Sequence, residues 1–219
     1  YAHGDQANQG STVTIDPANG GGSAVAGTTG DQYRNILTTG AEGYSYLKFN
    51  PVVGPSGTLV FTASNYINGF QLATSPRENF FVNMTTAAGT TGSTQIISSM
   101  SGWNFSAAAP VEGETWNVFN ESDFNATFPN PLNVGQVWTI TNNVPLTTAD
   151  GLDRGVAKMT VAYHAATDAL TSDRLNTVTG VGTVQPGGVM DRLMRNYWDR
   201  SGAGNFQRFT LSGLKPNTS

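Results

Sequence analysis

The side chains that most often do chemistry are scarce in this chain. Histidine occurs twice, as His3 and His164, and cysteine does not occur at all. A three-histidine metal site and every thiolate site are therefore excluded, and a Ser-His-Asp triad would have to use one of these two histidines. The sequence also lacks the Gly-x-Ser-x-Gly, His-Glu-x-x-His and Walker-type glycine motifs. These absences predict a protein that is not an enzyme.

Glu112 and Glu114 have the two-residue spacing that would place both carboxylates on one face of a strand. A glycosidase uses such a pair when the two groups flank a cleft. Pro110 and Gly113, however, mark this stretch as a turn. We therefore interpret the two glutamates as part of a solvated loop.

Carboxylates also occur in the stretch Asp150-Gly-Leu-Asp153 and between Asp168 and Asp173. Oxygen-rich loops of exported β-sandwiches can hold Ca²⁺, although neither stretch has the spacing of an EF-hand loop. Calcium is thus the one cofactor that the sequence leaves open, with Asp150 and Asp153 as the favoured ligands.

The tryptophans raise the alternative of a carbohydrate-binding module, because flat aromatic faces can pack on sugar rings. Trp116 and Trp138 lie in strand-like runs and are predicted to belong to the core. Trp103 follows Ser-Gly and precedes Asn, which favours an exposed position. Tyr197 and Trp198 form a second candidate, although a role in the core explains them more simply. The candidate ligand-binding residues are therefore Trp103, Tyr197 and Trp198.

Charge and composition restrict the partners. The formal net charge is -4, charged residues make up 12% of the chain, and the lysines are Lys48, Lys158 and Lys215. No basic stripe is available to neutralise a nucleic-acid backbone, so we expect no nucleic-acid partner. No apolar run approaches the roughly 20 residues that span a bilayer. The Thr-, Ser-, Asn- and Gly-rich composition favours a secreted or cell-surface protein.

Short strand-like runs recur at the spacing of an all-β sandwich. In the runs 156–163 and 207–212 the apolar residues partly alternate, as in half-buried antiparallel strands. The predicted strands are 11–15, 44–49, 58–63, 66–73, 79–84, 94–98, 115–119, 136–141, 156–163 and 207–212.

One segment has a different period. Val189-Met190, Leu193-Met194 and Tyr197-Trp198 are apolar pairs four residues apart. This spacing predicts a short amphipathic helix over about 188–199 that covers one end of the sandwich.

A change in composition near Pro76 divides the chain into a first segment, 1–75, and a second, 76–219. The first segment offers only four strands. Alone it would leave a sheet face and its edges open, so it needs strands from elsewhere.

Several stretches resemble a β-sandwich module of secreted and surface proteins of Verrucomicrobia and Planctomycetes, many of which carry a PEP-CTERM-type sorting signal. The stretches are Met190 to Trp198, Phe206 to Thr218, Ala2 to Ser11, Gly57 to Phe61 and Ile67 to Leu72. The resemblance implies an antiparallel, jelly-roll-like sandwich without a well-defined activity. It also implies that the two halves of the module are in permuted order here.

This order leaves three arrangements open. The segments could form one sandwich within a chain, they could pair between neighbouring copies as a fibre, or the chain could be cut from a tandem array. We therefore expect an extracellular structural or adhesive protein whose partners are other copies of itself, with a carbohydrate-binding module as the alternative. The residues predicted to lie in the assembly strands are Tyr66, Ile67, Phe70, Leu72, Phe209 and Leu211.

Overall fold

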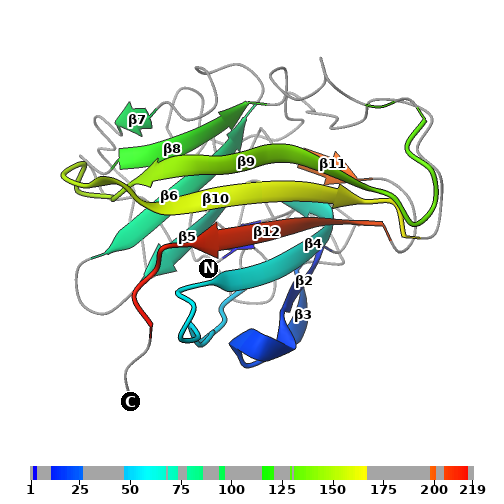
Figure 1. The fold of residues 1–219 in the computed structure, drawn as a ribbon, viewed down its shortest axis with the longest axis horizontal. Helices are drawn as coiled ribbons and strands as arrows, with labels where there is room; N and C mark the ends of the chain where they lie inside the picture. The colour runs from blue at the N-terminus through cyan, green and yellow to red at the C-terminus, as the bar shows by residue number, and fades with distance from the viewer. Residues whose placement is uncertain are drawn as a thin grey trace.

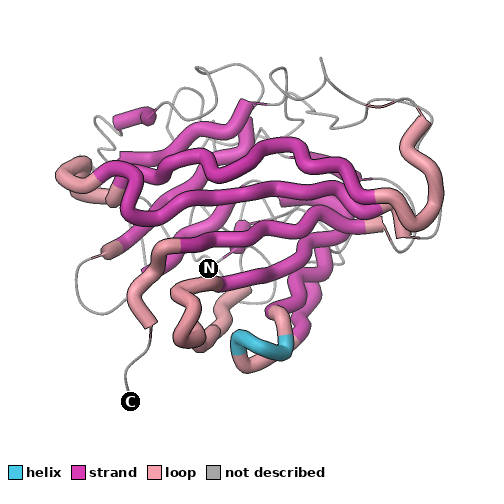
Figure 2. Tube along the Cα trace, in the orientation of Figure 1, coloured by secondary structure: helices cyan, strands magenta, loops and turns pink. Residues whose placement is uncertain are grey.

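The structure confirms the predicted all-β class. A computed structural model describes residues 2–3, 11–26, 47–67, 69–73, 78–85, 94–96, 115–120, 129, 131–166, 198–200 and 205–216. These residues form two sheets that lie one behind the other and cross at an angle (Figure 1). Figure 2 shows strands in both layers and one short helical turn, the 3-10 helix η1 (Pro17–Asn19).

The seven-stranded sheet lies toward the viewer in Figure 1, and all its neighbouring strands are antiparallel. Its order is β3 (Ser23–Ala26), β2 (Ser11–Ile15), β4 (Leu59–Ile67), β12 (Phe206–Ser212), β10 (Arg154–His164) and β9 (Val137–Thr147), and β11 (Trp198–Arg200) pairs with β4.

The five-stranded sheet lies behind it, and its one parallel pair is β6 with β8. Its order is β1 (Ala2–His3), β5 (Gly69–Ala73), β6 (Asn79–Thr85), β8 (Thr115–Asn120) and β7 (Thr94–Ile96). A single residue separates β4 in one sheet from β5 in the other, so the chain crosses between the layers at this corner.

Strands of the two predicted segments pair with each other inside the chain. β4 pairs with β12, and β5 pairs with β6, so each sheet contains strands from both segments. Every predicted assembly residue has a partner in the pairing: Tyr66 with Asp199, Ile67 with Trp198, Phe70 with Val82, Leu72 with Phe80, Phe209 with Phe61 and Leu211 with Leu59.

The prediction of a helix over 188–199 is wrong at its C-terminal end. Trp198 and Asp199 lie in β11, where Trp198 is opposite Ile67 of β4. Backbone pairing with a buried strand overrides the weaker helical periodicity at this point. The remainder of the predicted helix, 188–197, lies outside the described residues.

Aromatic rings from both layers meet in the core. Phe61 and Phe209, from adjacent strands of the seven-stranded sheet, stack with their ring centroids 4.8 Å apart and their planes at 13°. Phe70 of the five-stranded sheet approaches Phe61 edge-on, at 5.1 Å and 81°. All three side chains are buried. The Phe61–Phe209 contact joins the two predicted segments, and the Phe61–Phe70 contact joins the two sheets, both through apolar packing.

A buried asparagine also links the two sheets. Asn117 of β8 is 2% exposed, and its Nδ2 donates to the carbonyl oxygens of Phe81 at 3.0 Å and Thr147 at 2.8 Å. Its Oδ1 accepts from the Thr147 amide at 2.7 Å. The amide of Ala149, in the turn after β9, donates to the Asn79 carbonyl of β6. These hydrogen bonds close one edge of the sandwich.

Candidate functional site

The outer faces of the two sheets differ in exposure. Phe81, Trp116 and Val118 point away from the core on the five-stranded sheet, yet they are only 7%, 2% and 0% exposed. The side chains that point outward from the seven-stranded sheet are partly or fully exposed. Among the described residues, the second surface is therefore the one that a ligand or partner can reach.

Alternation along the strands builds this surface. From Ala157 onward in β10, and throughout β12, the odd-numbered residues are buried, so the even-numbered residues point to solvent. The outward residues define the surface that we call the outer face: Thr12, Thr14, Val60, Thr62, Ser64, Lys158, Thr160, Ala162, His164, Phe206, Arg208, Thr210 and Ser212.

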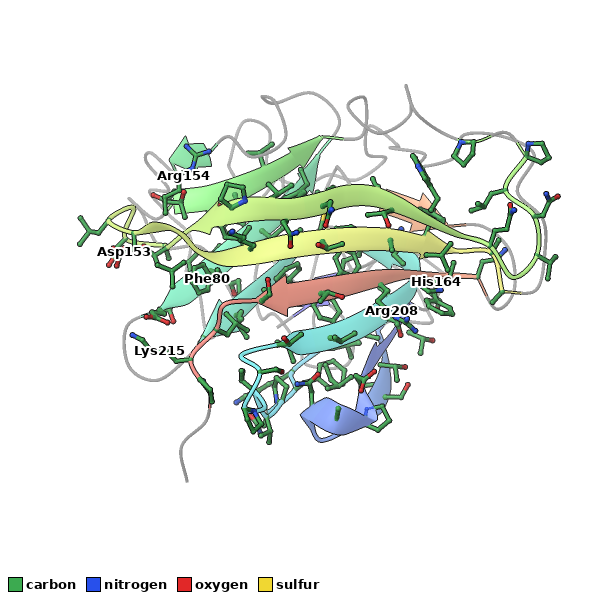
Figure 3. The ribbon with its side chains drawn as sticks, in the orientation of Figure 1. Phe80, Asp153, Arg154, His164, Arg208 and Lys215 are labelled. Carbon is green, nitrogen blue, oxygen red and sulfur yellow. The ribbon has the colours of Figure 1, made fainter. Side chains whose placement is uncertain are left out.

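A compact cluster lies at one end of the outer face (Figure 3). His164 of β10 is directly opposite Phe206 of β12, and their rings stack with centroids 4.6 Å apart and planes at 16°. The Arg208 guanidinium lies over the Phe206 ring, with Cζ 5.5 Å from the ring centroid. This contact is a cation–π interaction between residues two apart on one strand.

The electrostatics of the cluster keep the imidazole neutral. Burial, followed by the positive charge of Arg208, lowers the pKa of His164 below its ordinary value of 6.5. His164 is therefore uncharged at neutral pH, and Arg208 carries the permanent charge. The described surroundings of His164 contain an aromatic ring and a cation instead of the carboxylate and nucleophile that a catalytic triad requires.

Arg208 keeps hydrogen-bonding capacity that no described residue uses. Its Nε is buried without a hydrogen-bond partner, and no ion pair joins it to a carboxylate in the described part of the chain. Thr62 of β4 is opposite Arg208, and Thr14 of β2 is opposite Thr62, so hydroxyl-bearing side chains continue the row beside it. The site thus offers one guanidinium, two stacked rings and nearby hydroxyls.

The predicted calcium ligands lie in the turn between β9 and β10. Asp150 Oδ1 accepts from the Thr148 hydroxyl at 2.6 Å and from the Leu152 amide at 3.1 Å. These hydrogen bonds, led by that of Thr148, lower the pKa of Asp150. The Asp153 carbonyl, not its carboxylate, is bonded to the Thr148 amide. No group of three metal-ligating side chains occurs among the described residues, and calcium binding stays a prediction.

The predicted ligand-binding aromatics are not part of the cluster as described. Trp103 and Tyr197 lie outside the described residues, and for Trp198 only the backbone is described, in β11. Their role stays a prediction. Trp116, predicted to belong to the core, is 2% exposed and contacts Phe81, but it points away from the core between the two sheets. Trp138 is half-buried and packs against that core.

Sequence reasoning missed Phe206 and Arg208 as site residues. The available signal was the alternation of β12, which sends Gln207, Phe209 and Leu211 inward and the residues between them outward. An aromatic residue and a cation at two successive outward positions are a recognisable pattern. The pattern indicates a site only once the pairing of β10 with β12 places His164 beside Phe206.

Comparisons with known proteins place the chain in no group. No family model matches it, and no curated protein or solved structure shows significant similarity. The resemblance to the secreted bacterial module therefore stays a prediction. No helix among the described residues is long and apolar enough to cross a membrane.

Proposed function

We propose that this protein is an extracellular, non-catalytic adhesive protein that binds polymers through the outer face of its seven-stranded sheet. The observation that carries the proposal is the difference between the two outer surfaces. One buries Phe81, Trp116 and Val118, whereas the other leaves a row of Thr, Ser, Phe and Arg side chains accessible. A broad, polar sheet surface suits an extended ligand better than a small substrate, which binds in a concave pocket.

The composition supports the extracellular assignment and the chemistry supports a binding role. The chain has few charged residues, and it is rich in residues with hydroxyl and amide side chains. His164, the histidine whose side chain is described, stacks on Phe206 instead of pairing with a carboxylate. Carbohydrate chains are the polymers that a hydroxyl-rich surface with an aromatic ring fits best, since they offer hydroxyl groups and apolar C–H faces.

The test is a glycan microarray that carries neutral and acidic polysaccharides, probed with the full chain. Ala162→Glu places a long side chain in the middle of the outer face, and we expect it to abolish binding. Leu152→Glu is the matched control, because Leu152 is 82% exposed in the β9–β10 turn, outside the face. Failure of the wild type to bind any polymer, or equal binding by Ala162→Glu, would contradict the proposal.

A structural role as a fibre subunit is a second candidate, and one observation favours it. β4 of the first segment pairs with β12 of the second over five positions, which is the interface that strand exchange between copies would reuse. Refolding at high protein concentration should then yield oligomers, which size-exclusion chromatography separates from the monomer. Monomers alone at every concentration would exclude exchange while leaving adhesion through the outer face intact.

A further inference from the structure

The distribution of charge indicates which polymers the outer face selects. Six neighbouring strands of the seven-stranded sheet contain Arg154, Lys158 and Arg208 and no aspartate or glutamate. These strands are β3, β2, β4, β12, β10 and β9. The whole chain nevertheless carries a net charge of -4. β11, the seventh strand, contains Asp199 and Arg200, whose charges cancel. The carboxylates whose side chains are described lie in turns or directly before β6: Asp16, Glu78, Asp150 and Asp153. The sheet therefore presents positive charge in a protein that is acidic overall.

Two of these cations belong to the outer face. Lys158 is exposed on β10, and Arg208 on β12 is opposite Ala162, four positions further along β10. Four strand residues span about 13 Å, so an extended chain lying along the strands can meet both cations. Such a chain would therefore contact the outer face at two separate points.

The surroundings of Arg208 favour the binding of an anion. Its guanidinium is held over the Phe206 ring, and no described carboxylate neutralises it. A guanidinium binds carboxylate and sulfate groups through parallel charge-assisted hydrogen bonds, which are roughly twice as strong as neutral ones. The neighbouring Thr62 and Thr14 can hydrogen-bond to the hydroxyl groups of the same ligand.

We propose that the outer face binds an acidic polysaccharide, with Arg208 and Lys158 bound to its anionic groups and the stacked Phe206 and His164 rings beside the bound chain. This inference rests on the proposed function, since it assigns a ligand class to the same surface. Two cations are too few for the phosphate backbone of a nucleic acid, whose binding relies on many such contacts. The hydroxyl-bearing strands around them match a polyhydroxylated chain.

The experiment measures the affinity of the full chain for polygalacturonate, chondroitin sulfate and neutral dextran by biolayer interferometry. We expect binding to the acidic polymers, weaker binding to dextran, and a loss of affinity as NaCl is raised. Preference for polygalacturonate assigns carboxylates as the bound groups, and preference for chondroitin sulfate assigns sulfates. Arg208→Gln should weaken binding of the acidic polymers by about tenfold or more.

Lys215→Gln is the charge-matched control. Lys215 is 73% exposed, pairs with Glu78, and lies away from Arg208 in Figure 3. A second pair of variants places opposite charges at one position. Ala162→Lys should retain the binding of acidic polymers that Ala162→Glu loses. An equal loss of affinity for the acidic polymers in Arg208→Gln and Lys215→Gln would show an effect of net charge only and would overturn the inference.

The two proposals fail in different ways. If dextran and the acidic polymers bind equally, Arg208→Gln retains full affinity and Ala162→Glu still abolishes binding, the inference is overturned and the proposed function stands. If Ala162→Glu binds every polymer as the wild type does, the outer face is not the binding surface and both are overturned.

Discussion

Replacement of Asn117 by alanine should weaken the link between the two sheets and lower the free energy of unfolding. The change removes two donated hydrogen bonds, to Phe81 and Thr147, and the acceptor of the Thr147 amide, all in a side chain that is 2% exposed. A buried donor left without a partner costs about 1–3 kcal/mol, and each lost hydrogen bond contributes about 1 kcal/mol. We therefore expect the free energy of unfolding to fall by about 3–5 kcal/mol. For a chain of this size the melting temperature should fall by roughly 10 °C.

Urea unfolding followed by tryptophan fluorescence measures this change, with the exposed Asn50 mutated to alanine as the matched control. Asn117→Asp provides a second variant that keeps the Oδ1 acceptor and loses both donors. We expect it to destabilise the fold as well, because a carboxylate would then face two carbonyl oxygens. A loss below about 0.5 kcal/mol in both variants, as for surface substitutions, would refute the view that Asn117 links the sheets.

Three further predictions concern single side chains. Gln207 is fully buried and neither atom of its amide has a partner, so Gln207→Leu should raise the free energy of unfolding by about 1–2 kcal/mol; a decrease in urea unfolding would contradict this. Gly213 has φ +76°, and an added Cβ would lie 2.1 Å from the Val156 carbonyl oxygen, so Gly213→Ala should lower the free energy of unfolding by about 2–4 kcal/mol. In Gly54→Ala the added Cβ meets no atom within 4 Å, so thermal unfolding of this variant should be nearly unchanged. His164 has a lowered pKa in the fold, so its contribution to stability is complete above pH 6.5 and is lost as the pH falls toward the folded value. Proton NMR titration should give a pKa below 6.5, and a value at or above 6.5 would contradict the assigned environment.

Much of the strand content could be predicted from local pattern. The run 11–15 coincides with β2, and the run 115–119 misses only the last residue of β8. The run 136–141 stops six residues before the end of β9, because Asn142, Asn143 and Pro145 are typical of a turn. A register irregularity in the pairing with β10 accommodates them: Asn143 has φ 52°, and the Thr160 hydroxyl accepts from its amide at 3.1 Å.

The candidate site could not be predicted because it depends on register. Phe206 and His164 are 42 positions apart in the sequence and meet only because β10 and β12 pair in one register. A shift of β12 by one residue would send Phe206 to the core and away from His164. Apolar alternation indicates that each strand has an inner and an outer side, but it does not say which outward residues become neighbours. The local pattern therefore predicts the layers and not the surface cluster.

Hydroxyl-radical footprinting of the full chain, with and without saturating polygalacturonate, tests the binding surface most directly. Mass spectrometry reports the oxidation of each side chain, and we expect bound polymer to protect Phe206 and His164 and to leave Leu152 unchanged. Protection of Leu152 with undiminished oxidation of Phe206 and His164 would contradict binding through the outer face of the seven-stranded sheet.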